Sequence, residues 1–268
     1  MNIEMNRTAA KNPISARFAA AAHTYHEESS IQRTAAEELV ASIPSGGFDR
    51  ILEVGCGTGY LTELLTMSFP RALIDAVDIA RPMIDLARER MGDRGCIRWH
   101  AADARHFGPD REYPLIVSSS ALHWMTPIPE TVNRLAGMLQ PGGCFAAALM
   151  IRGTLGELHD ARQCLFPEKT ASVCLPSAEG FLEAVASAGL RTEACRQQVL
   201  QKQYCSARSF LLSLNRQGVT GAAGGGGKLL NRTELRKLLA YYDREFAAPG
   251  GGVIATYRIL YITARRQK

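Results

Sequence analysis

Short apolar runs alternate with amphipathic segments through the middle of the chain. The runs predict strands at residues 50–54, 72–78, 96–101, 113–119 and 143–150. The segments between them predict helices at residues 58–66, 82–91 and 128–139. Strands that alternate with helices form a parallel sheet with helices on both faces, so we expect an α/β fold here.

Helical patterns also precede and follow this region. Residues 14–43 are predicted to be helical, with a break near His23 and Thr24. One face of that segment carries Phe18, Ala22, Tyr25, Ser29 and Gln32. Beyond residue 150, the pattern predicts helices at 178–188, 206–215 and 232–246 and strands at 191–203 and 253–264. The spacing of Thr154 and Glu157 predicts a capping box.

These patterns divide the chain into four parts. We expect an N-terminal helical cover at residues 1–47 and a ligand-binding core at residues 48–150. A helical insertion with one strand, on the substrate side, is expected at residues 151–252, and the final strand and tail of the core at residues 253–268. An N-terminal helix outside the alternating region can cover a ligand pocket and exclude water.

Composition is that of an ordinary globular protein, with 46% hydrophobic and 21% charged residues in 268. No apolar run approaches the roughly 20 residues of a membrane helix, so we expect a cytoplasmic protein without a membrane partner. The seven cysteines form no C-x-x-C pair. This scatter favours buried thiols in a reducing compartment and no metal site.

The net charge of +5 is concentrated in one segment, because residues 201–245 carry eight basic residues against three acidic ones. An acidic partner or a phosphorylated substrate arm is one interpretation of this segment, and a solvated helix face is the other. The chain has no long basic stripe interleaved with aromatic residues, so a nucleic-acid partner is disfavoured.

Three alternate glycines follow the first predicted strand, in the order Glu53-x-Gly55-x-Gly57-x-Gly59. Glycine there lets backbone amides approach a ligand and permits positive φ angles. A dinucleotide fingerprint would need its third glycine at position 60, which is Tyr60. A nicotinamide-binding oxidoreductase and a non-catalytic nucleotide-binding module therefore remain as alternatives only.

Acidic residues mark the ends of three successive strands, namely Glu53, Asp78 and Asp103. Ligands of open α/β sheets lie beyond these carboxyl ends. Asp78, which lies 23 residues after Gly55, is placed to accept hydrogen bonds from both hydroxyls of a ribose. Ile79 and Met83 are either core residues or an apolar wall for the base.

The fourth strand ends in Ser118, Ser119 and Ser120, near the place where chemistry is expected. His123 and Trp124 follow. His123 is either a general base or a residue that shapes the pocket wall.

The stretch from Glu53 to Gly59 resembles motif I of the class I methyltransferases, which use S-adenosylmethionine and release S-adenosylhomocysteine. The resemblance implies a Rossmann-like sheet with an antiparallel last strand. It also implies that Glu53 helps to hold the methionine end, that Asp103 contacts the adenine amine, and that the Ala104 amide contacts a ring nitrogen. The expected cofactor-binding residues are Gln32, Glu53, Gly55, Cys56, Gly57, Gly59, Asp78, Ile79, Met83, Asp103, Ala104 and Ser119.

Four flanking segments narrow the resemblance to the malonyl-[acyl-carrier protein] O-methyltransferases of biotin synthesis. They are Arg17-Phe18-x-x-x-Ala22-x-x-Tyr25-x6-Gln32-Arg33, Gly153-Thr154-Leu155-x-Glu157-Leu158, Phe210-Leu-x-Ser213-Leu214-x-x-x-Gly218-Val-Thr220 and Ala255-Thr256-Tyr257-x-x-Leu260-Tyr261. The chain departs from the family at Leu214-Asn215, where Leu-Lys is usual, and at Gly221–Gly227, which replaces a polar loop.

This resemblance implies methyl transfer to the free carboxylate of a malonyl thioester, on acyl-carrier protein or coenzyme A. A carboxylic acid is ionised at pH 7, so no base is needed to make the nucleophile. We therefore expect a closed site and a positioning cation. The catalytic candidates are Tyr25 as part of the lid, Arg152 as the cation, and His123; Gln32 is expected to hold the methionine carboxylate. A methyltransferase of another small carboxylate is the alternative.

Overall fold

The computed structural model describes residues 13–92, 94–108, 111–170, 175–219 and 229–267. Its strands are β1 (Arg50–Val54), β2 (Leu73–Asp78), β3 (Ile97–Ala101), β4 (Tyr113–Ser119), β5 (Leu139–Met150), β6 (Leu190–Tyr204) and β7 (Val253–Arg266). The helices of the first half are α2 (Pro13–Glu28), α3 (Ser30–Ser42), α4 (Tyr60–Ser68), α5 (Arg81–Met91) and α6 (Ile128–Gly137), with the short turn η1 (Leu122–Trp124). Those of the second half are α7 (Gly156–Leu165), α8 (Ala178–Ser187), α9 (Ala207–Arg216) and α10 (Arg232–Glu245), with the short turn η2 (Pro167–Lys169).

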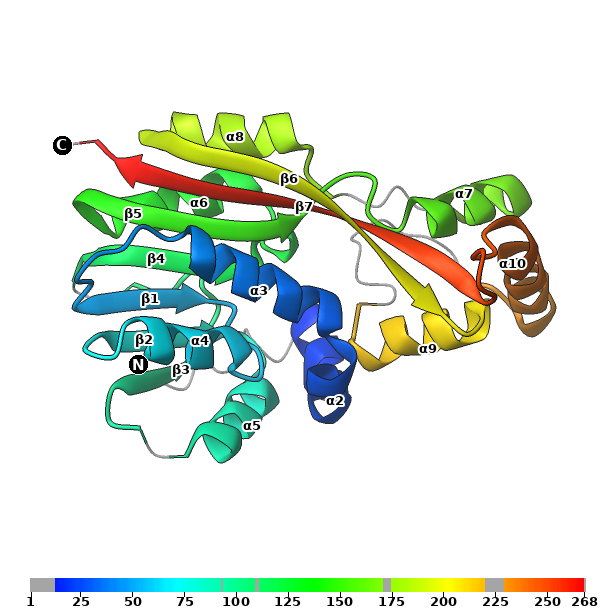
Figure 1. Ribbon diagram of the computed structural model, residues 1–268, viewed down its shortest axis with the longest axis horizontal. Coiled ribbons are helices and arrows are strands. Elements are labelled where there is room, and N and C mark those ends of the chain that lie inside the picture. Colours follow the sequence, from blue (N-terminus) through cyan, green and yellow to red (C-terminus); the bar gives the residue numbers. More distant parts are fainter. Residues whose placement is uncertain (1–12, 93, 109–110, 171–174, 220–228, 268) are drawn as a thin grey trace.

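The strands form a seven-stranded sheet in the order β3-β2-β1-β4-β5-β7-β6 (Figure 1). Strands β1 to β5 are mutually parallel, and β7 lies antiparallel to both β5 and β6. This arrangement confirms the predicted fold class. The chain leaves β1 toward β3 and returns to β4 on the other side of β1. The strand order therefore reverses between β1 and β4, where ligands of open α/β sheets bind.

Helices cover both faces of the sheet because successive strand residues point to opposite sides. Ile51 belongs to the apolar cluster that contains Leu39 of α3 and Leu65 of α4. Leu52 belongs to the opposite cluster, with Leu135 of α6 and Phe181 of α8. Each of these side chains is almost fully buried. Burying one of them stabilises the fold by about 1.5–3 kcal/mol, so these two clusters hold the layers together.

The N-terminal helices meet at Ser29 and not at the predicted break near His23. Thr24 stays inside α2, and its hydroxyl donates to the carbonyls of Ala21 and Arg216. Ser29 is buried and its hydroxyl donates to the carbonyl of His26. Hydroxyl bonds to the preceding turn and to α9 satisfy Thr24 within a helix, so the local sequence signal was misleading.

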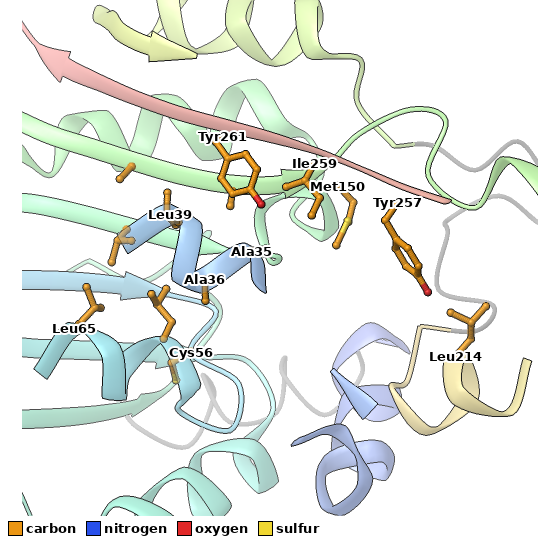
Figure 2. Close-up of a cluster of buried hydrophobic side chains, with 14 of the residues drawn as sticks. Ala35, Ala36, Leu39, Cys56, Leu65, Met150, Leu214, Tyr257, Ile259 and Tyr261 are labelled. Atoms are coloured by element: carbon orange, nitrogen blue, oxygen red, sulfur yellow. The ribbon is translucent and has the colours of Figure 1, made fainter. Parts of the chain in front are cut away.

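The insertion shares the core of the sheet. Figure 2 shows Leu214 of α9 beside Tyr257 of β7, in one cluster with Ala35 and Leu39 of α3. Strand β6, predicted as part of the insertion, is an edge strand of the main sheet. The segment predicted at residues 151–252 therefore extends the sheet and its core, while the Gly221–Gly227 loop lies outside the described residues.

Glu157 has an architectural role, although the predicted capping box with Thr154 is wrong. Helix α7 begins after Leu155, which adopts a left-handed conformation with φ 55°. The Glu157 carboxylate instead accepts hydrogen bonds from the backbone amide and the hydroxyl of Thr256 on β7. The Thr154 hydroxyl donates to the carbonyl of Arg258. Both residues tie α7 to the sheet.

No helix in the described ranges is long and apolar enough to cross a membrane.

Two neighbouring glycines allow a test of the turn that leads into β7. We expect Gly252→Ala to destabilise the protein by roughly 1–3 kcal/mol more than Gly251→Ala. Both have positive φ, at 73° and 89°. A Cβ on Gly252 would lie 2.1 Å from the Tyr204 carbonyl oxygen, whereas a Cβ on Gly251 would meet nothing within 4 Å. Urea unfolding of both variants measures the difference, and equal losses would contradict the steric argument.

Candidate active site

A cavity opens over the carboxyl ends of the strands, beside the switch point between β1 and β4. Its volume is about 690 Å³ when the open mouth is included. Strand ends and the loops after them form its floor, and α2 forms its cover. Its walls include Ile14, Phe18, Tyr25, Gly55, Gly57, Asp78, Ile79, Met83, Asp103, Ala104, Arg105, Ser119, Ser120, Trp124 and Met125.

The glycines of the loop after β1 have two roles: Gly55 and Gly57 line the cavity, and Gly59 allows close helix packing. Gly55 and Gly57 line the cavity with φ angles of 77° and 53°. A Cβ on Gly55 would lie 2.2 Å from the Cβ of Ala121, so glycine is required there. Gly59 lines neither this cavity nor the second hollow described below. A Cβ there would press on Ala87 of α5, so the third glycine serves the packing of α4 on α5.

Asp78 joins the ends of β1 and β2. One carboxylate oxygen accepts the Gly57 amide at 2.9 Å, and the other accepts the Ala80 amide at 2.8 Å. Burial raises the pKa of Asp78, and these two backbone bonds act against that shift. The carboxylate lines the cavity and each oxygen keeps a lone pair for another donor, so the residue can also bind hydroxyl groups.

Asp103 is paired with a residue that the sequence prediction overlooked. The Arg105 guanidinium forms a forked ion pair with both oxygens of Asp103, at 2.6–3.1 Å. Burial opposes ionisation of Asp103, but the bonds from Arg105 outweigh it and hold its pKa below the usual range. Arg105 also donates to the carbonyl of Thr126. The pair fixes Asp103 at the cavity wall.

Glu53 is not on the surface of the cavity. It is fully buried and lies on the same face of β1 as Ile51, the face that α4 covers. Neither carboxylate oxygen has a hydrogen-bond partner of standard geometry among the described residues, although the Thr62 hydroxyl of α4 lies near enough to act against the rise of the Glu53 pKa. Burial raises the pKa of Glu53 to about 8. The predicted direct contact with the methionine end is not supported by this position.

Aromatic side chains form the cover. Phe18 meets Trp124 of η1 edge-on, with ring centroids 5.9 Å apart, and meets Tyr25 at 6.2 Å. Ala22 packs with Ala80 and Met83 in a small buried cluster below. These contacts hold α2 against the loops after β2 and β4. Burial and the nearby charge of Asp78 raise the pKa of Tyr25, so its phenol stays protonated at neutral pH.

A second hollow continues past the glycine loop toward α3. It shares Tyr25, Gly55, Gly57, Ser119 and Ser120 with the first cavity. Its own walls are Ser29, Gln32, Arg33, Ala36, Cys56, Thr58, Tyr60 and Leu61.

Two serines lie where the two spaces meet. The hydroxyls of Ser119 and Ser120 are buried and have no partner in the described parts of the chain. Ser120 adopts a positive φ of 57°, which is uncommon for a residue with a side chain. Ser118 is different, because its hydroxyl donates to the carbonyl of Val54 and has a structural role.

His123 and Arg152 are not brought to either space. His123 is buried beside Trp124, lines neither cavity, and has its pKa lowered to about 3 by burial. It is therefore a neutral packing residue. Arg152 is exposed just beyond β5 and also lines neither cavity. The site assembles the other predicted residues except Glu53 and Gly59.

Comparison with known proteins agrees with this architecture. A profile of the methyltransferase domain matches residues 51–143. The malonyl-[acyl-carrier protein] O-methyltransferase of Paenibacillus sp. (strain JDR-2) is 31% identical over 262 residues, which cover 91% of this chain and 94% of that protein. The chain belongs to the malonyl-[acyl-carrier protein] O-methyltransferase family. It is thus a methyltransferase of the class I fold.

Solved structures share the fold of this family member at low sequence identity. The YcgJ protein from Bacillus subtilis matches with a TM-score of 0.63 and 14% identity, covering 88% of this chain and 99% of YcgJ. The geranyl diphosphate C-methyltransferase from Streptomyces coelicolor A3(2), solved with S-adenosyl-L-homocysteine, matches with a TM-score of 0.53 and 14% identity. That match covers 86% of this chain and 74% of the other.

The position of Glu53 predicts a specific pH dependence of stability. From about pH 4.3 to pH 8, the unfolded chain has lost the Glu53 proton while the folded chain retains it. The folded state binds more protons, so wild-type stability falls as pH rises across this window, by up to about 1.4 kcal/mol per pH unit. Glu53→Gln lacks this loss. Urea unfolding of both proteins at pH 5 and pH 8 measures the effect, and parallel pH profiles would disprove the raised pKa.

Proposed function

We propose that this chain transfers a methyl group from S-adenosylmethionine to the free carboxylate of a malonyl thioester on acyl-carrier protein, an early step of biotin synthesis. One observation carries the proposal. A chain 31% identical to the Paenibacillus enzyme along nearly its whole length places Asp78, Asp103 and the glycine loop around one covered cavity.

The residues of the cavity fit the cofactor. The Asp78 oxygens can accept hydrogen bonds from ribose hydroxyls, and Asp103 and Ala104, which line the same cavity, are proposed to contact the adenine edge. Ile79 and Met83 supply an apolar wall for the base. When bound, S-adenosylmethionine supplies an electrophilic methyl group on a positively charged sulfur. The S-adenosyl-L-homocysteine in the Streptomyces enzyme of the same fold supports this choice.

Methyl transfer to a carboxylate needs no general base, and few residues of the site could act as one. The acceptor carboxylate is ionised at neutral pH. Opposite charges cancel as the bond forms, so exclusion of water and correct placement favour the reaction. The Phe18–Trp124 contact closes the cavity on the side of α2. Tyr25, protonated and shared by both spaces, can donate a hydrogen bond to the acceptor.

The carrier is proposed to approach from the side of α10. Arg232, Arg236, Lys237 and Arg244 are exposed on this helix, at the outer end of the molecule (Figure 1). Arg244 pairs with its neighbour Glu245, while off this helix Lys202 bonds to the hydroxyl of Ser30 and Arg216 pairs with Glu28. Helix α10 also carries the three acidic residues of the segment, so its exposed cations, and not a large net charge, are what would attract an acidic partner.

A mass-spectrometric assay with malonyl-carrier protein, malonyl-coenzyme A and free diacids tests the substrate. We expect a methyl ester on the malonyl thioester. Ester formation only on free diacids would favour a methyltransferase of another small carboxylate. Calorimetric titration with S-adenosylhomocysteine and with NAD distinguishes either methyltransferase from a nicotinamide oxidoreductase. Binding of NAD but not of S-adenosylhomocysteine would overturn the proposal.

Tyr25→Phe tests the hydrogen bond from the cover. The variant keeps the ring that packs on Phe18 but loses the donor. We expect kcat/KM to fall by about 10- to 100-fold, the usual range for a hydrogen bond to a charged group. Arg152→Ala is the matched control, because Arg152 is exposed and lines neither cavity, and should retain activity within about twofold. A larger loss of kcat/KM in Arg152→Ala than in Tyr25→Phe would show that Arg152 is the cation that orients the substrate carboxylate.

Arg105→Leu tests the ion pair that holds Asp103. We expect its affinity for S-adenosylhomocysteine to fall by about tenfold or more, because Asp103 loses its fixed orientation and its charge partner. Arg134→Leu is the control, since Arg134 bonds to the Phe107 carbonyl nearby without contacting Asp103. Calorimetry on both variants measures the effect, and equal affinities would show that the pair is not needed for binding.

A further inference from the structure

A directed chain of hydrogen bonds runs from α9 to the second hollow. Its first acceptor is Glu28, the last residue of α2, whose carboxylate accepts the hydroxyl of Ser213 on α9 at 2.7 Å and the Arg216 guanidinium at 3.1 Å. The Ser213 bond, with help from Arg216 and against the effect of burial, lowers the pKa of Glu28. An ionised carboxylate can only accept, so the single hydroxyl proton of Ser213 is committed to Glu28.

The direction of every later bond follows from that first one. Ser213 must act as the acceptor toward Gln217, whose amide nitrogen lies 3.1 Å from the hydroxyl. The Gln217 carbonyl then faces the other way and accepts the amide nitrogen of Gln32 at 3.0 Å. Ser213 and Gln217 are both buried, at 5% and 3% exposure, so solvent does not compete for these bonds.

The chain ends at Gln32 with an unused acceptor. The Gln32 amide nitrogen is directed at Gln217, so its carbonyl oxygen Oε1 points away from that bond. Oε1 is buried and has no donor among the residues that the structure describes. Gln32 lines the second hollow. Leaving such a buried oxygen unpaired destabilises the protein, so the site is built to receive a donor.

Other walls of the second hollow carry groups that favour an anion, unlike the Gln32 oxygen, which can only accept a hydrogen bond. Arg33 lines it, with its guanidinium carbon 5.8 Å from the centre of the Tyr60 ring. Thr58, Tyr60 and Leu61, at the N-terminus of α4, line it as well. A helix N-terminus and a guanidinium both favour an anion. The hollow thus combines the unpaired Gln32 oxygen with an anion-binding wall, which suits the ammonium and carboxylate of an α-amino acid.

We propose that Gln32 Oε1 accepts the ammonium group of the methionine end of the cofactor, while Arg33 binds the carboxylate. Gln217, Ser213 and Glu28 are positioning residues that determine which end of the Gln32 amide faces the hollow. The proposal rests on the cofactor named under the proposed function. It reverses the sequence prediction that Gln32 binds the carboxylate.

The assignment also explains why two distant segments both carry the family resemblance. Glu28 and Ser213 lie 185 residues apart, as do Gln32 and Gln217. The N-terminal segment supplies the residue that touches the cofactor, and the segment around Ser213 sets the orientation of its amide. The insertion is thereby part of the cofactor site.

Three ligands distinguish the two ends of the methionine group by calorimetry. They are S-adenosylhomocysteine, its analogue with hydrogen in place of the amino group, and its analogue with hydrogen in place of the carboxylate. We expect Gln217→Leu and Glu28→Gln to weaken binding of S-adenosylhomocysteine and of the decarboxylated analogue by about 10- to 100-fold. Both variants should bind the desamino analogue within about twofold of wild type.

Arg33→Met should show the complementary pattern, weakening binding of the two carboxylate-bearing ligands and sparing the decarboxylated one. Thr24→Val is the matched control for the docking of α2 on α9, because it removes the bond to the Arg216 carbonyl without touching the chain of amides. Equal losses for all three ligands in Gln217→Leu, or amine-specific loss in Thr24→Val, would overturn the assignment. Absence of S-adenosylhomocysteine binding to wild type would instead defeat the proposed function.

Discussion

The carboxylate of Asp78 holds together the two loops on which the site depends. It accepts one backbone amide from the glycine loop after β1 and another from the turn after β2. Because the group is buried, these bonds compensate for part of its lost hydration. With the two turns joined, Ser15 of α2 can bond to the Ile79 carbonyl, and Ala22 can pack on Ala80. The cover therefore rests on a surface that Asp78 organises.

The cover and the insertion are stabilised by each other. Helix α9 meets the junction of α2 and α3 through a polar chain that no apolar residue interrupts, and Gly218 approaches Arg17 so closely that a Cβ would lie 2.9 Å from its carbonyl oxygen. On the sheet side, Leu214 packs in the cluster of Tyr257 and Leu39 (Figure 2). A displacement of the insertion would thus change both the shape of the core and the polarity of the second hollow.

The site contributes position and exclusion of water more than proton transfer. His123, the residue whose type suggests a base, is buried, neutral and away from the cavity. The polar groups that do line the two spaces are backbone amides, hydroxyls, the Gln32 amide, the phenols of Tyr25 and Tyr60, and charged side chains. Such groups orient an already ionised acceptor and withhold solvent from it, which suits a reaction that joins opposite charges.

The sequence by itself determined the sheet, the glycine loop and the acids Asp78 and Asp103, because local periodicity and strand-end position follow directly from residue order. The tertiary structure alone decided which of these residues reach the cavity. Successive residues of β1 face opposite sides of the sheet, and Glu53 is on the buried face that α4 covers. Gly59 is needed for the close packing of α4 on α5 and does not line the cavity. The hydrogen-bond partners of Asp103 and Gln32 could not be predicted from the sequence either. Arg105 is two residues from Asp103 in the sequence, but only its side-chain conformation brings the two charges together. Gln217 is 185 residues from Gln32. Hydrogen-bond direction and burial arise only when distant segments meet, so no local pattern could have shown them.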